Sequence, residues 1–264
     1  MTEFATSADG TRIAFERIGS GPALVLVDGA MCYREFGPAR DVAAELADAY
    51  TVYIYDRRGR GESGNTAPYS VQREVEDLAA VIGATGEDAF VMGQSSGGAL
   101  VLEAAASGVP MKKLAAYESP FVGLRPGKDG APRNYLAELD ALLAKGDRGG
   151  TVEYFMVDMV GAPRFVPLMM RLMPKVWKQL QAVAHTVPND ARVMGPSFEV
   201  PVERFAGIAV PCLIMAGSKG KREMLQAQER IAAAVPGALH TVLAGQTHQV
   251  SPKALAPELR AFFA

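Results

Sequence analysis

The chain has 264 residues, of which 49% are hydrophobic and 21% charged, so it can bury a sizeable core and is not a disordered or fibrous protein. Its 27 basic and 29 acidic residues give a formal net charge of −2, and no long run of one sign favours nucleic acid as a partner. The apolar stretches are too short to span a membrane, and nothing resembles a secretory signal. We expect a cytoplasmic globular protein that binds a small-molecule substrate and no membrane, with a homodimer left open.

Short apolar runs alternate with helical patterns in the first third of the chain, which is typical of parallel strands joined by crossover helices. Two strands, 2–7 and 11–17, are predicted to form a hairpin around the turn dipeptide Asp9-Gly10. Continuous apolar runs predict buried strands at 23–27, 51–55, 88–92 and 112–117. Apolar residues three or four apart predict helices at about 39–49, 71–84 and 96–107.

Strand signals then stop and return only at 210–216. The intervening pattern is helical and is divided by Gly and Pro, with helices expected at 135–145, 152–160 and 174–184. We interpret 121–200 as a helical cap inserted into a core formed by 1–120 and 201–264. The core is predicted to end with a helix at 222–235, a strand at 239–243 and a helix to Phe263 that has Ser251 as N-cap and Pro252 in its first turn.

The strongest motif is Gly93-Gln94-Ser95-Ser96-Gly97, between a predicted strand and a predicted helix. Gly-x-Ser-x-Gly spacing alone is weak evidence, and an ordinary turn is the alternative, but a strand-to-helix position is typical of a nucleophile elbow. The glycines would let neighbouring backbone approach closely while the Ser95 hydroxyl projects from the sheet edge. The start of the helix would aim the Ser96 N–H at a negative charge forming there.

With this motif in its setting, nearly the whole chain resembles the α/β-hydrolase superfamily. The resemblance implies an α/β-hydrolase fold, with a mostly parallel eight-stranded sheet, helices on both faces and a helical cap after the sixth strand. The segment from Asp56 to Ser63, DRRGRGES, is similar to the family's Asp-x-Arg-Gly-x-Gly-x-Ser turn. We expect Asp56 and Arg58 to satisfy loop backbone groups there. The glycine pattern in the same segment is not interpreted as a dinucleotide site, because no helix opens within it.

A serine nucleophile needs a base, and the chain has only three histidines. His185 lies in the predicted insertion and His240 begins a predicted strand, so solvated or structural roles are expected for both. His248 lies between the last strand and the terminal helix, where the family places its base. Strand-end loops converge on the elbow, and His248 is therefore the predicted base.

The orienting acid is not at the family's usual site, since the segment after the seventh strand reads Gly-Ser-Lys-Gly-Lys. Glu118 directly follows the sixth strand, and some branches of the family resemble this by placing the acid there. It would lie at the carboxyl end of its strand and keep the chain order Ser, Glu, His. Glu118 is the predicted triad acid, with a cap-anchoring role or replacement by Glu223 as alternatives.

The loop after the third strand departs from the family, which usually has His-Gly where this chain has Asp28-Gly29. We expect the Ala30 N–H to join that of Ser96 as an oxyanion donor. Asp28 is expected to be a hydrogen-bonded structural residue or a group that tunes a proton or contacts substrate. Cys32 has no evident partner base and is not expected to act as a nucleophile.

The predicted cap is rich in Met and aromatic residues, most of which should pack internally. Some must face the pocket, and the predicted substrate-binding residues are Asp28, Met31, Met156 and Met159. No metal or cofactor is expected, because no Cys, His and Asp cluster has ligand spacing. We predict a serine-dependent hydrolase of a small, fairly hydrophobic ester or lactone. The alternatives are the same triad used for C–C bond hydrolysis, acyl transfer or cofactor-free haloperoxidase chemistry, and a non-catalytic ligand receptor.

Overall fold

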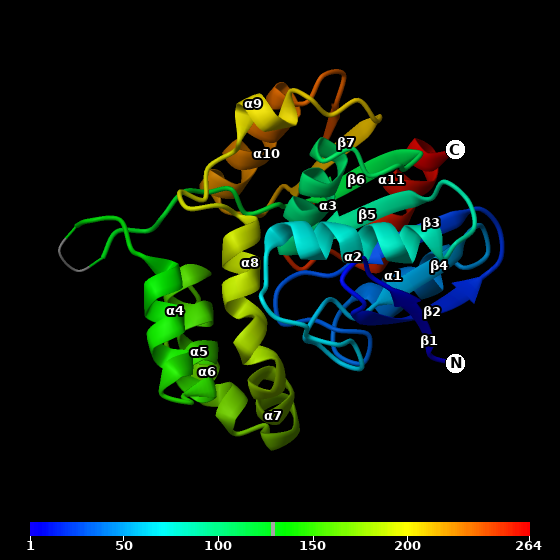
Figure 1. Cartoon of the computed structure of the whole chain (residues 1–264). Coiled ribbons are helices and arrows are strands. Elements are labelled where there is room, and N and C mark those ends of the chain that lie inside the picture. The colour runs from blue at the N-terminus through cyan, green and yellow to red at the C-terminus, as the bar shows by residue number, and fades with distance from the viewer. Residues whose placement is uncertain (128–129) are drawn as a thin grey trace.

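The computed structural model describes residues 1–127 and 130–264. Its centre is an eight-stranded sheet with the strand order β1-β2-β4-β3-β5-β6-β7-β8, in which β1, β2 and β4 pair antiparallel and all other neighbours pair parallel (Figure 1). The strands are β1 (Glu3–Thr6), β2 (Arg12–Gly19), β3 (Ala23–Val27), β4 (Thr51–Tyr55), β5 (Phe90–Gln94), β6 (Lys113–Tyr117), β7 (Cys212–Gly217) and β8 (Leu239–Leu243).

Helices connect the parallel strands and fill the interval between β6 and β7. The helices are α1 (Ala39–Leu46), α2 (Val71–Gly83), α3 (Ser96–Ala106), α4 (Tyr135–Ala144), α5 (Arg148–Tyr154), α6 (Phe165–Arg171), α7 (Pro174–Val183), α8 (Val187–Val193), α9 (Val202–Phe205), α10 (Arg222–Ala234) and α11 (Pro252–Phe263). A π-helical turn, η1 (Phe155–Met159), extends α5, and a 3₁₀ turn, η2 (Ala184–Thr186), precedes α8.

The central strands are buried on both faces, which explains their uninterrupted apolar sequences. All five residues of β3 are buried, and because successive side chains of a strand point to opposite faces, they enter two cores. Leu24 and Leu26 pack with α1 and α11 in one core, whereas Val25 and Val27 pack with α2 and α3 in the other. The predicted layered α/β-hydrolase architecture is confirmed.

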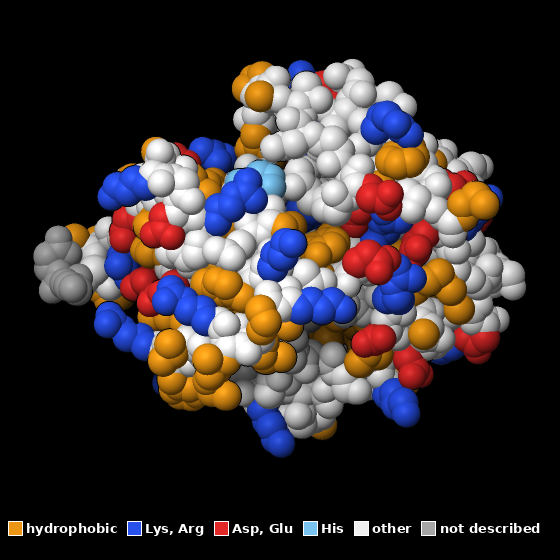
Figure 2. Space-filling view, turned by 90° about the horizontal axis from the view of Figure 1, so that it is seen from below, with side chains coloured by type: hydrophobic (Ala, Val, Ile, Leu, Met, Phe, Trp, Pro, Cys, Tyr) orange, Lys and Arg blue, Asp and Glu red, His pale blue; other side chains and the backbone are white. Residues whose placement is uncertain are grey.

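The helices between β6 and β7 form a body beside the sheet, and α8 lies between α4 and α3 (Figure 1). We call the segment from α4 through α8 the helical segment. Figure 2 shows hydrophobic side chains gathered on the face seen from below, and the exposed large hydrophobic residues of α6 and its end include Phe165, Leu168, Met169 and Leu172. The hydrophobic side chains of the central strands, by contrast, are enclosed.

Most predicted elements are present with small shifts at their ends. The strand predicted at 88–92 runs instead over Phe90–Gln94, because parallel pairing continues to the partners Gln94 and Tyr117. This shift brings the end of β5 directly to Ser95. Pro252 begins α11, and Ser251 occupies the N-cap position, although its side chain makes no capping hydrogen bond.

The corrections to the predicted helices fall between β6 and β7. The helix predicted at 152–160 is α5 followed by the wider π turn η1, and α6, α8 and α9 were not predicted. Pro188 lies in the first turn of α8, where a missing N–H costs nothing, so this proline does not end a helix. Within residues 1–127 and 130–264, none of the helices combines the length and apolarity that crossing a bilayer requires.

Candidate active site

Ser95 lies in a strained turn between β5 and α3. Its φ of 57° and ψ of −128° place a non-glycine residue at positive φ, an unfavourable conformation that surrounding contacts must hold. The Ser95 N–H donates to the Tyr117 carbonyl at 2.9 Å, and its carbonyl accepts from Ala99 at 3.1 Å. These bonds to β6 and to the first turn of α3 fix the backbone and leave the hydroxyl on the pocket wall.

The glycines around Ser95 permit a close approach of backbone. A Cβ on Gly93 would collide with the Gly97 carbonyl, and a Cβ on Gly97 would collide with the carbonyl of Val27. Strand β5, helix α3 and strand β3 can therefore meet at this point only with glycine at both positions. The close packing predicted for the motif is confirmed.

The structure brings Ser95, His248 and Glu118 into one hydrogen-bonded row. His248 Nε2 lies 3.1 Å from Ser95 Oγ, and His248 Nδ1 lies 2.7 Å from Glu118 Oε2. With Nδ1–H donated to the carboxylate, Nε2 is the unprotonated nitrogen that can accept the serine proton. The three residues come from the ends of β5 and β6 and from the loop after β8.

Glu118 is held as firmly as Ser95. It is 1% exposed, it also has a positive φ of 46°, and its Oε1 accepts the Gly217 N–H at 2.9 Å. Glu223 lies on α10 and lines the pocket, but the carboxylate that contacts His248 is that of Glu118. The sheet thus supplies at the end of β6 the carboxylate that the loop after β7 lacks.

The His248 loop is fixed to the strand ends by backbone acceptors. The His248 carbonyl accepts from Gln94 Nε2 at 3.1 Å, and the Thr247 carbonyl accepts from the Tyr117 hydroxyl at 2.5 Å. The His248 side chain itself is 37% exposed. The imidazole therefore sits on a rigid loop with one edge open to the pocket.

The predicted oxyanion donors flank Ser95. Ala30 and Ser96 both line the pocket, and Gly29 lies so close that an added Cβ would be 3.4 Å from Ser95 Oγ. Ser96 is the first residue of α3, so its N–H has no acceptor within the helix. Both N–H groups are thus on residues beside the serine oxygen.

A cavity of about 340 Å³ opens over Ser95 and His248, within the usual size range of small-molecule sites. Most of its lining is apolar and comes from both the core and the helical segment. The apolar lining residues are Ala30, Pro120, Val122, Phe155, Met159, Val160, Ala191, Met194, Phe198 and Met224. Arg125, Lys219 and Lys221 add positive charge to the same lining.

Of the predicted substrate-binding residues, the cavity lining includes Met159 but not Asp28, Met31 or Met156. The π turn places Phe155 and Met159 on the cavity, while Met156 packs against the core. Met31 is buried in the loop after β3. Asp28 is buried beside Gly37 and the start of α1, and burial raises its pKa to about 7 although Arg60 and Arg57 act against this.

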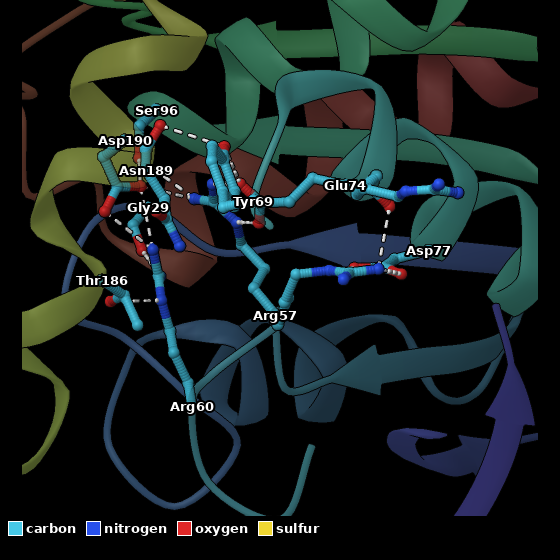
Figure 3. Close-up of polar contacts among 12 residues, drawn as sticks. Gly29, Arg57, Arg60, Tyr69, Glu74, Asp77, Ser96, Thr186, Asn189 and Asp190 are labelled. Atoms are coloured by element: carbon cyan, nitrogen blue, oxygen red, sulfur yellow. Dashed lines mark hydrogen bonds and ion pairs between the residues drawn. The ribbon is translucent and has the colours of Figure 1, made fainter. Parts of the chain in front are cut away.

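A buried ionic cluster that the sequence pattern did not predict lies behind Ser96 (Figure 3). Arg57 and Arg60, each 1% exposed, both contact Asp190 of α8, and Arg57 also pairs with Glu74. Burial alone would raise the pKa of Asp190, but the two arginines outweigh it and hold the pKa below its ordinary value. Removing one partner of such a buried pair typically costs about 3–5 kcal/mol. Two arginines in the turn were the only signal, and no local pattern links them to a residue 130 positions away.

Asp56 and Arg58 have the structural role expected of them. Asp56 accepts the N–H groups of Arg34 and Glu62 at 2.7 and 2.9 Å, and Arg58 bonds Asp77 and the carbonyl of Thr66. Neither residue lines the cavity. The turn between β4 and α2 is thereby braced from inside.

The remaining nucleophilic and basic groups lie apart from the row. Burial raises the pKa of the Cys32 thiol to about 12, which keeps it protonated at neutral pH. His185 is half-buried in η2 with a pKa lowered by burial, and His240 is exposed on β8. In the part of the chain that the structure describes, no group of three His, Cys, Asp or Glu side chains is arranged to hold a metal ion.

Comparison with known proteins agrees with this geometry. The model of the alpha/beta hydrolase family matches residues 22–258. An alpha/beta hydrolase from Sphaerobacter thermophilus is 46% identical, with a TM-score of 0.90, over 99% of this chain and 100% of its own.

Two more distant structures share the fold. The enol-lactonase from Burkholderia xenovorans is 17% identical with a TM-score of 0.73, over 99% of both chains. A bromoperoxidase from Bacillus anthracis is 18% identical with a TM-score of 0.75, over 100% of this chain and 99% of its own. The family match and the Sphaerobacter thermophilus structure both extend over nearly all of the sequence. The chain therefore belongs to the alpha/beta hydrolase family.

Proposed function

We propose that this hydrolase cleaves a small, fairly hydrophobic carboxylic ester or lactone through an acyl-enzyme on Ser95. The observation that carries the proposal is the row of Ser95 Oγ, His248 and Glu118 at 3.1 and 2.7 Å on the wall of a mainly apolar cavity. The distances are those of a nucleophile that can pass its proton to a base held by a carboxylate.

In the proposed reaction, the Ser95 proton moves to His248 Nε2 while Oγ forms a bond to the substrate carbonyl carbon. The carbonyl π electrons move to oxygen, where the N–H groups of Ala30 and Ser96 face the negative charge. Collapse breaks the bond to the alkoxide, which takes the proton from His248. Water then repeats the sequence, with His248 as base, and releases the acid and free Ser95. Glu118 holds the imidazole and stabilises its charged form.

Two arguments limit the class of substrate. The apolar lining suits an acyl chain or ring, and ester or lactone oxygen leaves with less assistance than an amine. The enol-lactonase and the bromoperoxidase share only the fold with this chain at 17% and 18% identity, and their names mark the two chemistries that the test must separate.

The test is covalent labelling with a fluorophosphonate, followed by intact mass and peptide mapping. We expect stoichiometric phosphonylation of Ser95, none in Ser95→Ala, and undiminished labelling in Cys32→Ser. A parallel screen of short-chain p-nitrophenyl esters, aliphatic lactones, 1,3-diketones and peracid formation should show its highest kcat/KM with an ester or lactone. An unlabelled protein that binds a small ligand would favour a receptor, and labelling with highest turnover of a diketone or peracid would favour the alternative chemistries.

A further inference from the structure

One buried arginine connects the loop after β3 to the helical segment (Figure 3). Arg60 Nη1 donates to the carbonyls of Gly29 at 2.6 Å and Cys32 at 3.1 Å. Its Nη2 donates to the two carboxylate oxygens of Asp190 at 2.9 and 2.7 Å, and its Nε donates to Thr186 Oγ1 at 3.1 Å. These contacts engage all three nitrogens of the guanidinium, so its position and rotation are fixed.

The Gly29 carbonyl shares a peptide unit with the Ala30 N–H. A trans peptide is planar and its C=O and N–H point in opposite directions, so an arginine that fixes the oxygen also fixes the direction of the N–H. The charged donor polarises this peptide as well, which makes its N–H a stronger donor. Gly29 lies against Ser95 and Ala30 lines the cavity, so the N–H opposite Arg60 is the one expected to meet the oxyanion.

The same loop carries backbone strain that needs support. Met31 has a φ of 63°, unfavourable for a residue with a long side chain, and it lies between the two carbonyls that Arg60 holds. Besides the guanidinium, a long hydrogen bond from the Cys32 N–H to the Gly29 carbonyl, at 3.4 Å, closes this turn. Arg60 therefore selects one conformation of a loop that would otherwise relax.

Asp190 connects Arg60 to Ser96, the residue that carries the second proposed oxyanion donor. Its Oδ1 accepts the Ser96 hydroxyl at 2.8 Å and Arg57 Nη1 at 2.7 Å, while Arg57 Nη1 also approaches the Asp28 carbonyl at 3.3 Å. One carboxylate from α8 thus holds the arginine behind Ala30 and the side chain of Ser96. Arg57 and Arg60 occupy two of the three variable positions of the turn motif, so the motif itself does not require them.

We propose that Arg60, clamped by Asp190, is a positioning residue that orients the Ala30 N–H toward the developing oxyanion. The inference rests on the proposed function, since it assigns a support to one of its donors. Arg60 does not line the cavity, so it acts through the peptide and not on substrate. If instead the Arg60 and Asp190 pair only anchors α8 to the core, its loss would alter stability or substrate binding and leave kcat unchanged.

The experiment compares Arg60→Lys and Thr186→Val with the matched control Arg58→Lys. Lysine keeps the charge near Asp190, but its single ammonium lacks the planar fork through which three guanidinium nitrogens hold the two carbonyls, the carboxylate and Thr186 in fixed directions. Thr186→Val removes the acceptor of Nε without burying an unpaired charge. Arg58 is buried in the same turn with Asp77 and Asp9 but does not contact the loop after β3. Circular dichroism and thermal melting establish folding, and kcat and KM are measured on p-nitrophenyl butyrate.

Because an oxyanion donor acts only in the transition state, its misplacement should lower kcat with little change in KM. We expect kcat to fall about 10- to 100-fold in Arg60→Lys and a few-fold in Thr186→Val, set against the 10²- to 10³-fold cost of losing a donor outright. The rate of Ser95 phosphonylation should fall in parallel, and the inhibition constant of butyrate should not change. Arg58→Lys should keep the wild-type kcat.

Different results would overturn the proposed function and the positioning role of Arg60. A wild-type protein that is neither phosphonylated nor active overturns the proposed function. A labelled, active wild type with folded Arg60 and Thr186 variants that retain kcat, or that change only KM, overturns the positioning role. If Arg60→Lys does not fold, Thr186→Val decides: a fall in kcat and phosphonylation rate supports the role, and unchanged values refute it.

Discussion

The edge of the sheet and the helical segment both contribute to the cavity, but they are built differently. Ser95 and Glu118 sit in strained backbone directly at strand ends, each held by hydrogen bonds to a neighbouring strand. The helical segment contributes mainly adaptable side chains such as Phe155 and Met159, and it leaves several large apolar residues exposed. The contrast teaches that rigid strand ends fix the reacting groups, whereas the helices shape the space around them.

The largest effect is expected from a change of Glu118, the acid at the edge of the sheet. In Glu118→Gln, the amide is neutral and its NH2 group can donate to His248 Nδ1, so the imidazole is no longer held in the tautomer with a proton on Nδ1. We expect kcat on an activated ester to fall about 10³- to 10⁴-fold, by analogy with a triad Asp→Asn change, with folding retained by circular dichroism.

Glu223→Gln serves as the comparison for this variant, because Glu223 also lines the cavity but does not contact His248. Its effect on kcat should be at least 100-fold smaller. The assignment of the acid is wrong if Glu118→Gln turns over near normally while Glu223→Gln is impaired.

A smaller effect is expected on the helical side. Met159→Ala widens the cavity without touching the catalytic row, so kcat/KM should shift by about 10-fold between short and long acyl chains, as one to two methylenes of contact are lost or accommodated. The measurement is a series of p-nitrophenyl esters from acetate to octanoate. Met156→Ala is the matched control, since Met156 lies in the same turn but off the cavity. Equal chain-length profiles for the two variants would contradict the lining role of Met159.

The last prediction concerns the free energy of unfolding and not turnover. The pKa of Asp28 is raised to about 7 by burial, whereas an unfolded aspartate titrates near 3.9. Between these values the folded state binds the extra proton, so Asp28 lowers stability progressively as pH rises from about 4 to about 7. Asp28→Asn should therefore be more stable than wild type, by about 1.5 kcal/mol at pH 5 and about 4 kcal/mol at pH 8, measured by urea unfolding.

Asp56→Asn should lose stability where Asp28→Asn gains it, because Asp56 bonds the buried Arg34. This variant should be less stable than wild type throughout the same pH range. A stability difference between Asp28→Asn and wild type that stays constant with pH would show that Asp28 ionises in the folded protein as it does in the unfolded chain.

The core of the fold was predictable because its signals are local. Uninterrupted apolar runs identified the buried strands, and the glycines around Ser95 marked the turn at which β3, β5 and α3 approach closely. The helical segment was less predictable. The start of α8 at Val187 and the π turn after α5 were not predicted from the local sequence pattern.

The sequence by itself determined the layered fold and pointed to Ser95, His248 and Glu118, since each follows a recognisable strand whose carboxyl end lies at one edge of the sheet. Only the tertiary structure decided which acid reaches the imidazole, that Asp28 and Met31 lie off the cavity, and that Arg60 joins Asp190 to the Gly29 carbonyl. The physical reason is that strand ends follow from short-range hydrophobic pattern, whereas a hydrogen bond between residues 130 positions apart depends on how separate elements pack.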